Sequence, residues 1–148
     1  MYKKFALMLF SAAGALAFQA TPATAGWVPY GNTNPITSSK SSWRCQTTQK
    51  VTDNVGAQVC TIRSPDRQGV QGAVIVRNDT NYLYSTSASM TVYNQYAGIA
   101  GNWSCSSSGV AAKSWSVCFG TTFPVTSGYT YTTEGYANNT WLKFSGYN

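Results

Sequence analysis

The sequence contains no histidine and few charged residues, and both absences narrow the chemistry available to it. Without histidine there is no serine–histidine or cysteine–histidine nucleophile, and no general base of the usual kind near neutral pH. Only four acidic residues occur in the 148-residue chain, whereas glycoside hydrolysis normally needs two carboxylates flanking the scissile bond. Asp53, Asp66 and Asp79 fall at predicted turns or strand ends, which leaves Glu134 as the least explained acid. The sequence therefore predicts a protein that is not an enzyme.

Motifs for metals, cofactors and nucleic acid are also missing. There is no C-x-x-C pair, no glycine-rich phosphate loop and no calcium-loop pattern, so we expect neither a metal nor a cofactor. Six basic and two acidic residues lie between Lys40 and Arg77, but they are dispersed rather than clustered. Nucleic acid, which needs a dense basic stripe with aromatic platforms, is therefore not an expected partner.

No long apolar run follows residue 25, and the single run before it is too short to span a membrane comfortably. Lys3 and Lys4 precede an apolar stretch from Phe5 to Phe18, which leads to the small-x-small triplet Ala23-Thr24-Ala25. This order is typical of a secretory signal peptide over residues 1–25, cleaved near Ala25–Gly26. We therefore expect a secreted, extracellular protein without stable membrane insertion, whose mature chain of residues 26–148 forms one domain.

Four cysteines in an exported chain predict two disulfides, for which three connectivities exist. We favour Cys45–Cys60 and Cys105–Cys118, because each pair encloses a short segment with turn residues that can fold as a hairpin. The alternative is an inter-sheet bridge of the immunoglobulin type, from Cys45 or Cys60 to Cys105 or Cys118.

Short alternating segments make up most of the mature chain. The most apolar of them, Val70–Asn78, predicts a central strand, and residues 80–96, 114–120, 127–136 and 140–148 also alternate. We expect an all-β fold, a small β-sandwich of six to eight short antiparallel strands with two disulfides, over residues 41–148. Trp43 and Trp103 each stand two positions before a cysteine, so each indole is expected to pack against a bridge.

Residues 26–40 lack this alternation and contain Pro29 and Pro35, which predicts an extended N-terminal arm. The arm either packs along a sheet edge or stays disordered, or it docks into another molecule. In the docking case Trp27 and Tyr30 are the expected anchors, by strand addition or by filling a groove.

Aromatic residues form 14% of the chain and stand among serine, threonine and asparagine rather than among charges. Tyrosine in such a setting is typical of binding surfaces, including sugar-binding faces where rings stack on pyranose C–H groups. Tyr82 with Tyr84, and Tyr129 with Tyr131, are the candidate ligand platforms, each pair alternating along one strand face. The alternative is that many of these rings fill the core or pair across strands.

One loop resembles a protease-inhibitor loop in its chemistry. Arg63-Ser64-Pro65 follows Cys60 closely, and an exposed, bridge-supported turn can present an arginine to a trypsin-like pocket. Ser-Pro-Asp is also a common turn sequence, which offers a purely structural explanation of the same residues.

From Trp43 to Gly120 the chain resembles small exported actinobacterial proteins of uncharacterised function. The likeness rests on the W-x-C start, the second cysteine, the "VQGAVIVRN" segment and the "VCFGTT" close. The arrangement of a short N-terminal arm followed by a disulfide-linked β domain is also similar to the small adaptor subunit of streptomycete umbrella toxin particles. In that subunit an extended N-terminal segment joins two larger components, which implies a protein partner for the arm of this chain.

Three functional hypotheses follow. The first is a secreted, non-catalytic binding or adaptor protein that contacts an extracellular protein partner, in part through residues 26–40. The second is a module that binds carbohydrate or the cell surface through tyrosine and tryptophan rows. The third is a secreted protease inhibitor that presents Arg63.

Overall fold

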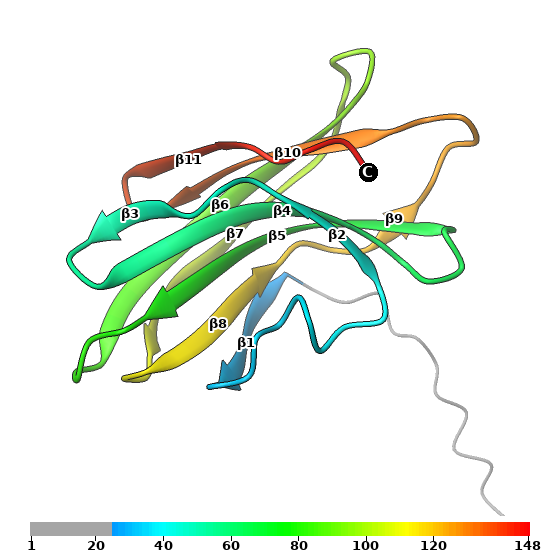
Figure 1. Ribbon diagram of the computed structural model, residues 1–148. Coiled ribbons are helices and arrows are strands. Elements are labelled where there is room, and N and C mark those ends of the chain that lie inside the picture. Colours follow the sequence, from blue (N-terminus) through cyan, green and yellow to red (C-terminus); the bar gives the residue numbers. More distant parts are fainter. Residues whose placement is uncertain (1–24) are drawn as a thin grey trace, which may run out of the picture.

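The computed structural model describes residues 25–148 and contains two antiparallel sheets that pack face to face (Figure 1). The seven-stranded sheet runs in the order β1 (Gly26–Gly31), β8 (Ser114–Phe119), β5 (Gly69–Asn78), β4 (Val55–Arg63) and β2 (Ser42–Cys45). Two short strands complete it: β3 (Gln49–Thr52) pairs with β4, and β9 (Phe123–Pro124) pairs with β5. The four-stranded sheet has the order β11 (Thr140–Phe144), β10 (Tyr131–Ala137), β6 (Tyr84–Asn94) and β7 (Ile99–Val110).

The predicted all-β sandwich is confirmed, with eleven strands within residues 25–148 rather than six to eight. The difference comes from segments such as β9 with two residues and β2 and β3 with four each, which are too short for an alternation to be read. Val70–Asn78 is central as expected, because β5 pairs with both β4 and β8. No helix within residues 25–148 is long and apolar enough to cross a membrane.

Alternation along the strands builds the core between the sheets. Val74 and Val76 of β5 face Met90 of β6 and Leu142 of β11, and all four side chains are at most 2% exposed. The sheets approach closely at Gly135, where a Cβ atom would lie 2.7 Å from Cγ2 of Val59 on the opposite sheet. A glycine in β10 is therefore required by the packing of the two layers.

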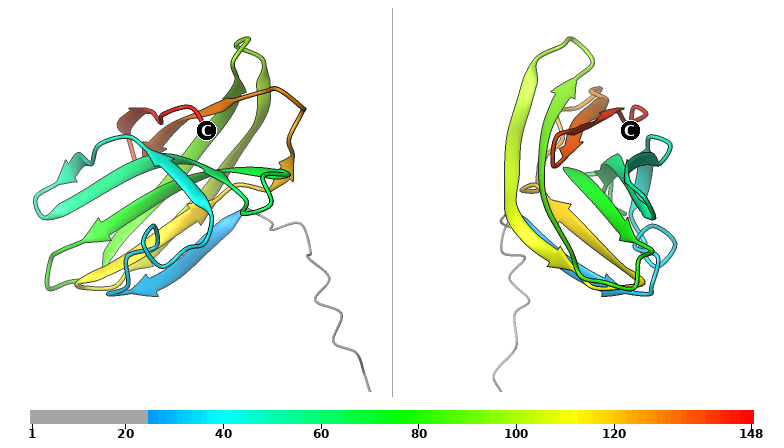
Figure 2. Two further views of the ribbon diagram at one scale, coloured as in Figure 1. Left: turned by 45° about the vertical axis from the view of Figure 1, so that its right-hand side comes forward. Right: turned by 90° about the vertical axis from the view of Figure 1, so that its left-hand side faces the viewer.

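The outer face of the seven-stranded sheet is covered as well. A second apolar cluster includes Ile75 and Val117, and Tyr30, Ile36 and Trp43 pack against it. Ile36 belongs to the loop that returns from β1 past β8 before entering β2 (Figures 1 and 2). Ile75 is thus buried although it points away from the sandwich interior.

The predicted N-terminal arm is therefore part of the folded domain. Its first six residues are strand β1, which pairs with β8, and the Trp27 indole donates a 2.8 Å hydrogen bond to the carbonyl of Ser106. Tyr30 contacts Phe119, with the ring centroids 6.5 Å apart. Of the two alternatives, the structure shows the arm packed along a sheet edge, and both expected anchors are occupied inside the domain rather than free to dock.

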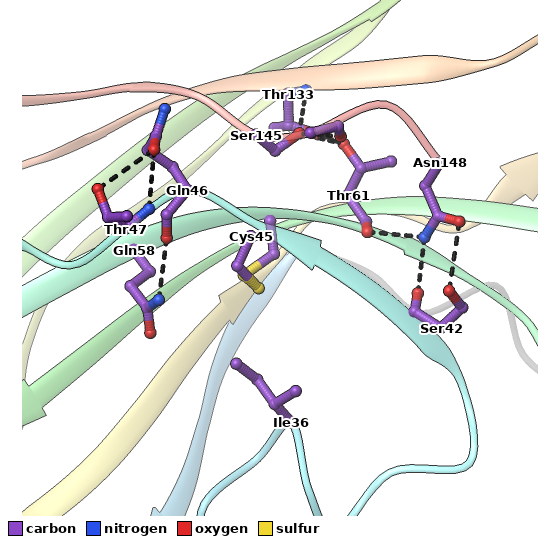
Figure 3. Close-up of a disulfide and its surroundings, with 12 residues drawn as sticks. Ile36, Ser42, Cys45, Gln46, Thr47, Gln58, Thr61, Thr133, Ser145 and Asn148 are labelled. Carbon is purple, nitrogen blue, oxygen red and sulfur yellow. Dashed lines mark hydrogen bonds between the residues drawn. A yellow bond between two sulfur atoms is a disulfide. The ribbon is translucent and has the colours of Figure 1, made fainter.

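Both favoured disulfides are confirmed. Cys45–Cys60 links directly paired residues of β2 and β4, and Trp43 packs in the same cluster. Between these cysteines, Asp53 and Asn54 form the two-residue turn of the β3–β4 hairpin, with Asn54 at φ 56°. Figure 3 shows Ile36 on one side of this bridge and the Thr61–Ser145 hydroxyl contacts on the other.

The second bridge does not close a hairpin, which corrects the expectation from sequence. Cys105 lies on β7 of the four-stranded sheet and Cys118 on β8 of the seven-stranded sheet, with a Cα–Cα distance of 6.0 Å. This disulfide therefore joins the two layers. Trp103 packs against the core cluster that contains both cysteines, and its indole stacks on Phe123 with the ring centroids 5.9 Å apart. Direct contact between this indole and the bridge stays a prediction.

Candidate binding face

The outer surface of β6, β10 and β11 gathers aromatic side chains that stay exposed in the part of the chain that the structure describes. On β10, Tyr131 and Thr133 point into the sandwich, so Glu134 and Tyr136 point out. On the neighbouring strands Tyr93 of β6 and Trp141 of β11 share this outer side. We call Tyr93, Glu134, Tyr136, Trp141 and Phe144 the aromatic face.

A β-bulge in β11 brings Trp141 and Phe144 to the same side. Residues three apart on a regular strand point to opposite faces. Here the pairing shifts between Tyr136, opposite Trp141, and Glu134, opposite Phe144, and Lys143 adopts a φ of 65°. The extra residue turns Phe144 outward, as bulges commonly re-aim a side chain.

The rings are close but not coplanar. The Trp141 and Phe144 centroids are 6.3 Å apart with an interplanar angle of 89°, and those of Phe144 and Tyr93 are 6.1 Å apart at 52°. Trp141 and Phe144 expose 46% and 42% of their surface, so a large part of each ring is available to a ligand. Edge-to-face contacts of this kind hold the rings in a defined relative orientation.

Glu134 lies at the centre of the aromatic face and is held from both sides. Its Oε1 accepts a 3.0 Å hydrogen bond from Nε1 of Trp141, and its Oε2 accepts a 3.3 Å bond from the hydroxyl of Tyr93. Burial, followed by the nearby Glu134 charge, raises the pKa of Tyr93 above its ordinary value, so the tyrosine keeps its proton. The carboxylate is thus a fixed acceptor flanked by rings.

A pocket of about 510 Å³ adjoins the aromatic face, a volume in the range of small-molecule sites. It lies between the turn that follows β6 and the residues that follow β11. Its lining combines rings, carboxamides and hydroxyls: Tyr93, Asn94, Gln95, Ala97, Thr132, Phe144, Ser145 and Tyr147. Tyr147 forms an outer wall and is 58% exposed.

The electrostatics of this sheet are close to neutral. Across β6, β7, β10 and β11 the only charged residues are Glu134 and Lys143, which carry opposite signs. The seven-stranded sheet, by contrast, contains Arg44, Lys50, Arg63 and Arg77. A charged polymer would therefore find little net attraction on the aromatic face.

A second pocket, of about 430 Å³, lies on the outer side of the seven-stranded sheet. Its one cation, Arg77, bonds Asp79 at 2.7 Å and Asn32 at 2.9 Å and stacks over Trp115. Because these partners already occupy the Arg77 guanidinium, this pocket has fewer free hydrogen-bonding groups for a ligand than the aromatic face has.

The tyrosine rows predicted from sequence are not the exposed aromatic face. Tyr131 is 2% exposed and belongs to the core, and Tyr84 packs against the core from the start of β6. Tyr129 precedes β10, where its ring meets Tyr96 at 5.2 Å, and Tyr82 is 77% exposed in a loop. Neither pair forms a row, because only one member of each pair lies on a strand.

The proposed inhibitor residue is also buried. Arg63 is 5% exposed at the end of β4, and its Nη2 donates to the carbonyls of Asn148 at 2.7 Å and Tyr129 at 3.2 Å. Burial, and then the charge of Arg67, lower the pKa of Arg63. A side chain held in this way cannot enter a protease pocket, so the inhibitor prediction is wrong in this form.

Sequence reasoning missed most of the aromatic face. Only Glu134 could have indicated the site from sequence, because it is an acidic residue that no predicted turn or helix cap explains. Tyr93, Trp141 and Phe144 lie on predicted strands, but their shared side depends on strand pairing and on the bulge at Lys143. No local pattern reveals that bulge.

Comparison with known proteins finds no family model that matches the chain and no curated protein similar to it in sequence. The resemblance to small exported actinobacterial proteins therefore stays a prediction. Within residues 25–148, no group of three or more cysteine and acidic side chains is arranged to hold a metal ion.

Proposed function

We propose that this protein is a non-catalytic binding module whose aromatic face recognises a neutral polysaccharide. The observation that carries the proposal is the cluster of exposed rings around a fixed carboxylate on a nearly uncharged sheet. Rings supply stacking surfaces for the C–H faces of sugars, and Glu134 accepts hydrogen bonds from sugar hydroxyls. Both disulfides support a site of action in an oxidising, extracellular compartment.

Ring orientation favours one kind of polysaccharide. A flat crystalline surface would be matched by coplanar rings, whereas Trp141 and Phe144 are perpendicular. Perpendicular rings instead form a corner that holds a single chain from two sides. The proposed ligand is therefore a soluble chain rather than a crystalline face.

Replacing both Trp141 and Phe144 with alanine is expected to abolish this binding. Removing an anchor ring costs more than about 1 kcal/mol, so the two together weaken binding by at least about thirty-fold. Affinity electrophoresis in gels that contain soluble neutral polysaccharides should show retardation of the wild type and free migration of the double variant. Both rings are half-exposed but also contact Tyr93 and Glu134, so the free energy of unfolding should fall by about 1–3 kcal/mol, which leaves the variant folded at room temperature.

Tyr82→Ala provides the control, since it removes an even more exposed ring, 77% exposed, from a loop outside the aromatic face. This variant should be retarded as strongly as the wild type. Equal retardation of the Trp141/Phe144 variant, or free migration of the wild type in every polysaccharide, would contradict the proposal.

The adaptor hypothesis loses its predicted docking segment, because β1 pairs with β8 and Ile36 covers the sheet behind it. Deleting residues 26–40 would remove a strand rather than a free arm.

A further inference from the structure

The pocket beside the aromatic face contains two carboxamides whose oxygen atoms are already used. Asn94 Oδ1 accepts from the backbone N–H of Tyr96 at 2.9 Å and of Gly98 at 3.2 Å. Gln95 Oε1 accepts from the backbone N–H of Thr130 at 2.6 Å and from its hydroxyl at 2.9 Å. These bonds identify the oxygen of each amide and hold each side chain in place.

The two NH₂ groups are left as donors. No acceptor for Asn94 Nδ2 or Gln95 Nε2 occurs among residues 25–148, although both side chains line the pocket. Thr132 adds an acceptor to the lining, because its hydroxyl donates to the carbonyl of Ser145 at 2.8 Å. Its oxygen also lies 3.4 Å from Oγ of Ser145, a contact that uses at most one of its two lone pairs. The pocket thus offers fixed donors, an acceptor and no charged residue.

Apolar walls complete the pocket. Phe144 and Tyr147 provide ring surface, and Ala97 provides a methyl group. A ligand group that matches this lining has a carbonyl oxygen for the two NH₂ donors, an N–H for Thr132 and a methyl for the rings. A carboxylate fits less well, because no lysine or arginine lines the pocket to balance its charge.

We propose that this pocket holds the acetamido group of an N-acetylated amino sugar, while Trp141 and Phe144 contact the neighbouring sugar rings. This inference rests on the proposed function and names its ligand class: a neutral glycan that contains N-acetylhexosamine. The acetamido group presents a carbonyl oxygen for the amide donors, an N–H for Thr132 and a methyl group for the rings at the same time. A plain sugar hydroxyl has a single oxygen for these polar groups and no methyl group for the ring surfaces, so it matches less of the lining.

Isothermal titration calorimetry of the wild type with three soluble hexasaccharides tests the assignment. The first is built from N-acetylglucosamine, the second from glucose and the third from glucosamine without acetyl groups. Binding of the acetylated chain should be at least ten-fold tighter than binding of the glucose chain. The deacetylated chain should bind no better than glucose, since it lacks the carbonyl and the methyl.

Asn94→Asp and Gln95→Glu sharpen the test. Each carboxylate can still accept the same backbone bonds, so the fold should be preserved, but the NH₂ donor is lost and a repulsive oxygen faces the ligand carbonyl. Each variant should lose about ten-fold in affinity for the acetylated chain with little change for the glucose chain. Gln68→Glu, an exposed turn residue before β5, controls for the added charge.

The outcomes separate the two proposals. Equal binding of the acetylated and glucose chains, or unchanged preference in both carboxylate variants, overturns the acetamido assignment and leaves the polysaccharide proposal standing. Absence of binding to all three hexasaccharides and to the polysaccharide panel overturns both.

Discussion

Replacing Cys105 and Cys118 together with alanine is expected to lower the free energy of unfolding by about 3 kcal/mol, the loop-closure contribution of a bridge with this spacing. Both residues are at most 5% exposed, so loss of their sulfur atoms from the core adds to the effect. For a domain whose total stability is about 5–15 kcal/mol, this is a large fraction. The melting temperature should fall by roughly 10 °C or more.

Because this bridge joins the two sheets, its removal should also change the packing between them. Because β7 and β8 belong to different layers, the double alanine variant should loosen the packing of Trp103, which lies against the same core. Near-ultraviolet circular dichroism and tryptophan fluorescence, measured with the unfolding curve, report that change. A Cys45/Cys60 double alanine variant is the control, since its bridge lies within one sheet. An unfolding free energy within 1 kcal/mol of the wild type for Cys105/Cys118 would contradict the prediction.

Arg63→Met should destabilise the protein by about 2 kcal/mol. Methionine retains the apolar stem beside Tyr131 but removes the donor to the carbonyls of Asn148 and Tyr129. An unpaired buried carbonyl costs about 1–3 kcal/mol, and Asn148 keeps one further bond from the Tyr131 N–H. Arg63 Nε has no acceptor within the described residues, so its loss adds no cost.

Denaturant unfolding and hydrogen exchange together measure this effect. The paired amides of Tyr131 and Asn148 should exchange faster in the variant, because Arg63 ties the segment after β11 to β4. Arg67→Met, a neighbouring and exposed arginine, should change neither quantity. Unchanged stability in Arg63→Met would show that the buried guanidinium contributes nothing to the free energy of unfolding and would contradict the prediction.

Much of the fold could be predicted because it depends on short-range signals. Val70–Asn78 is apolar and bounded by turn residues, so its place as a central strand follows from local composition. The Cys45–Cys60 pairing follows from the Asp53–Asn54 turn, which brings the two ends of its segment together. The Cys105–Cys118 pairing was correct, but its hairpin rationale was not, since those cysteines lie on separate sheets.

The aromatic site was harder to predict because alternation alone does not reveal which side of a strand faces solvent. Tyr131 and Tyr93 both lie on alternating strands, yet Tyr131 is buried and Tyr93 contacts Glu134 on the outside. Their orientation is set by the pairing of β10 with β6 and by the second sheet above them. The arm illustrates the same limit: residues 26–40 lack any pattern of their own, and the edge of β8 gives them their strand.

The amino-acid sequence by itself determined the all-β class, the hairpin that pairs Cys45 with Cys60 and the scarcity of catalytic groups, since these depend on composition and near-neighbour spacing. Tertiary structure alone decided which rings face solvent, where Arg63 lies and how two carboxamides come to line one pocket. The physical reason is that register, bulges and the contact of two layers arise between residues far apart in the chain. No local stretch contains that information.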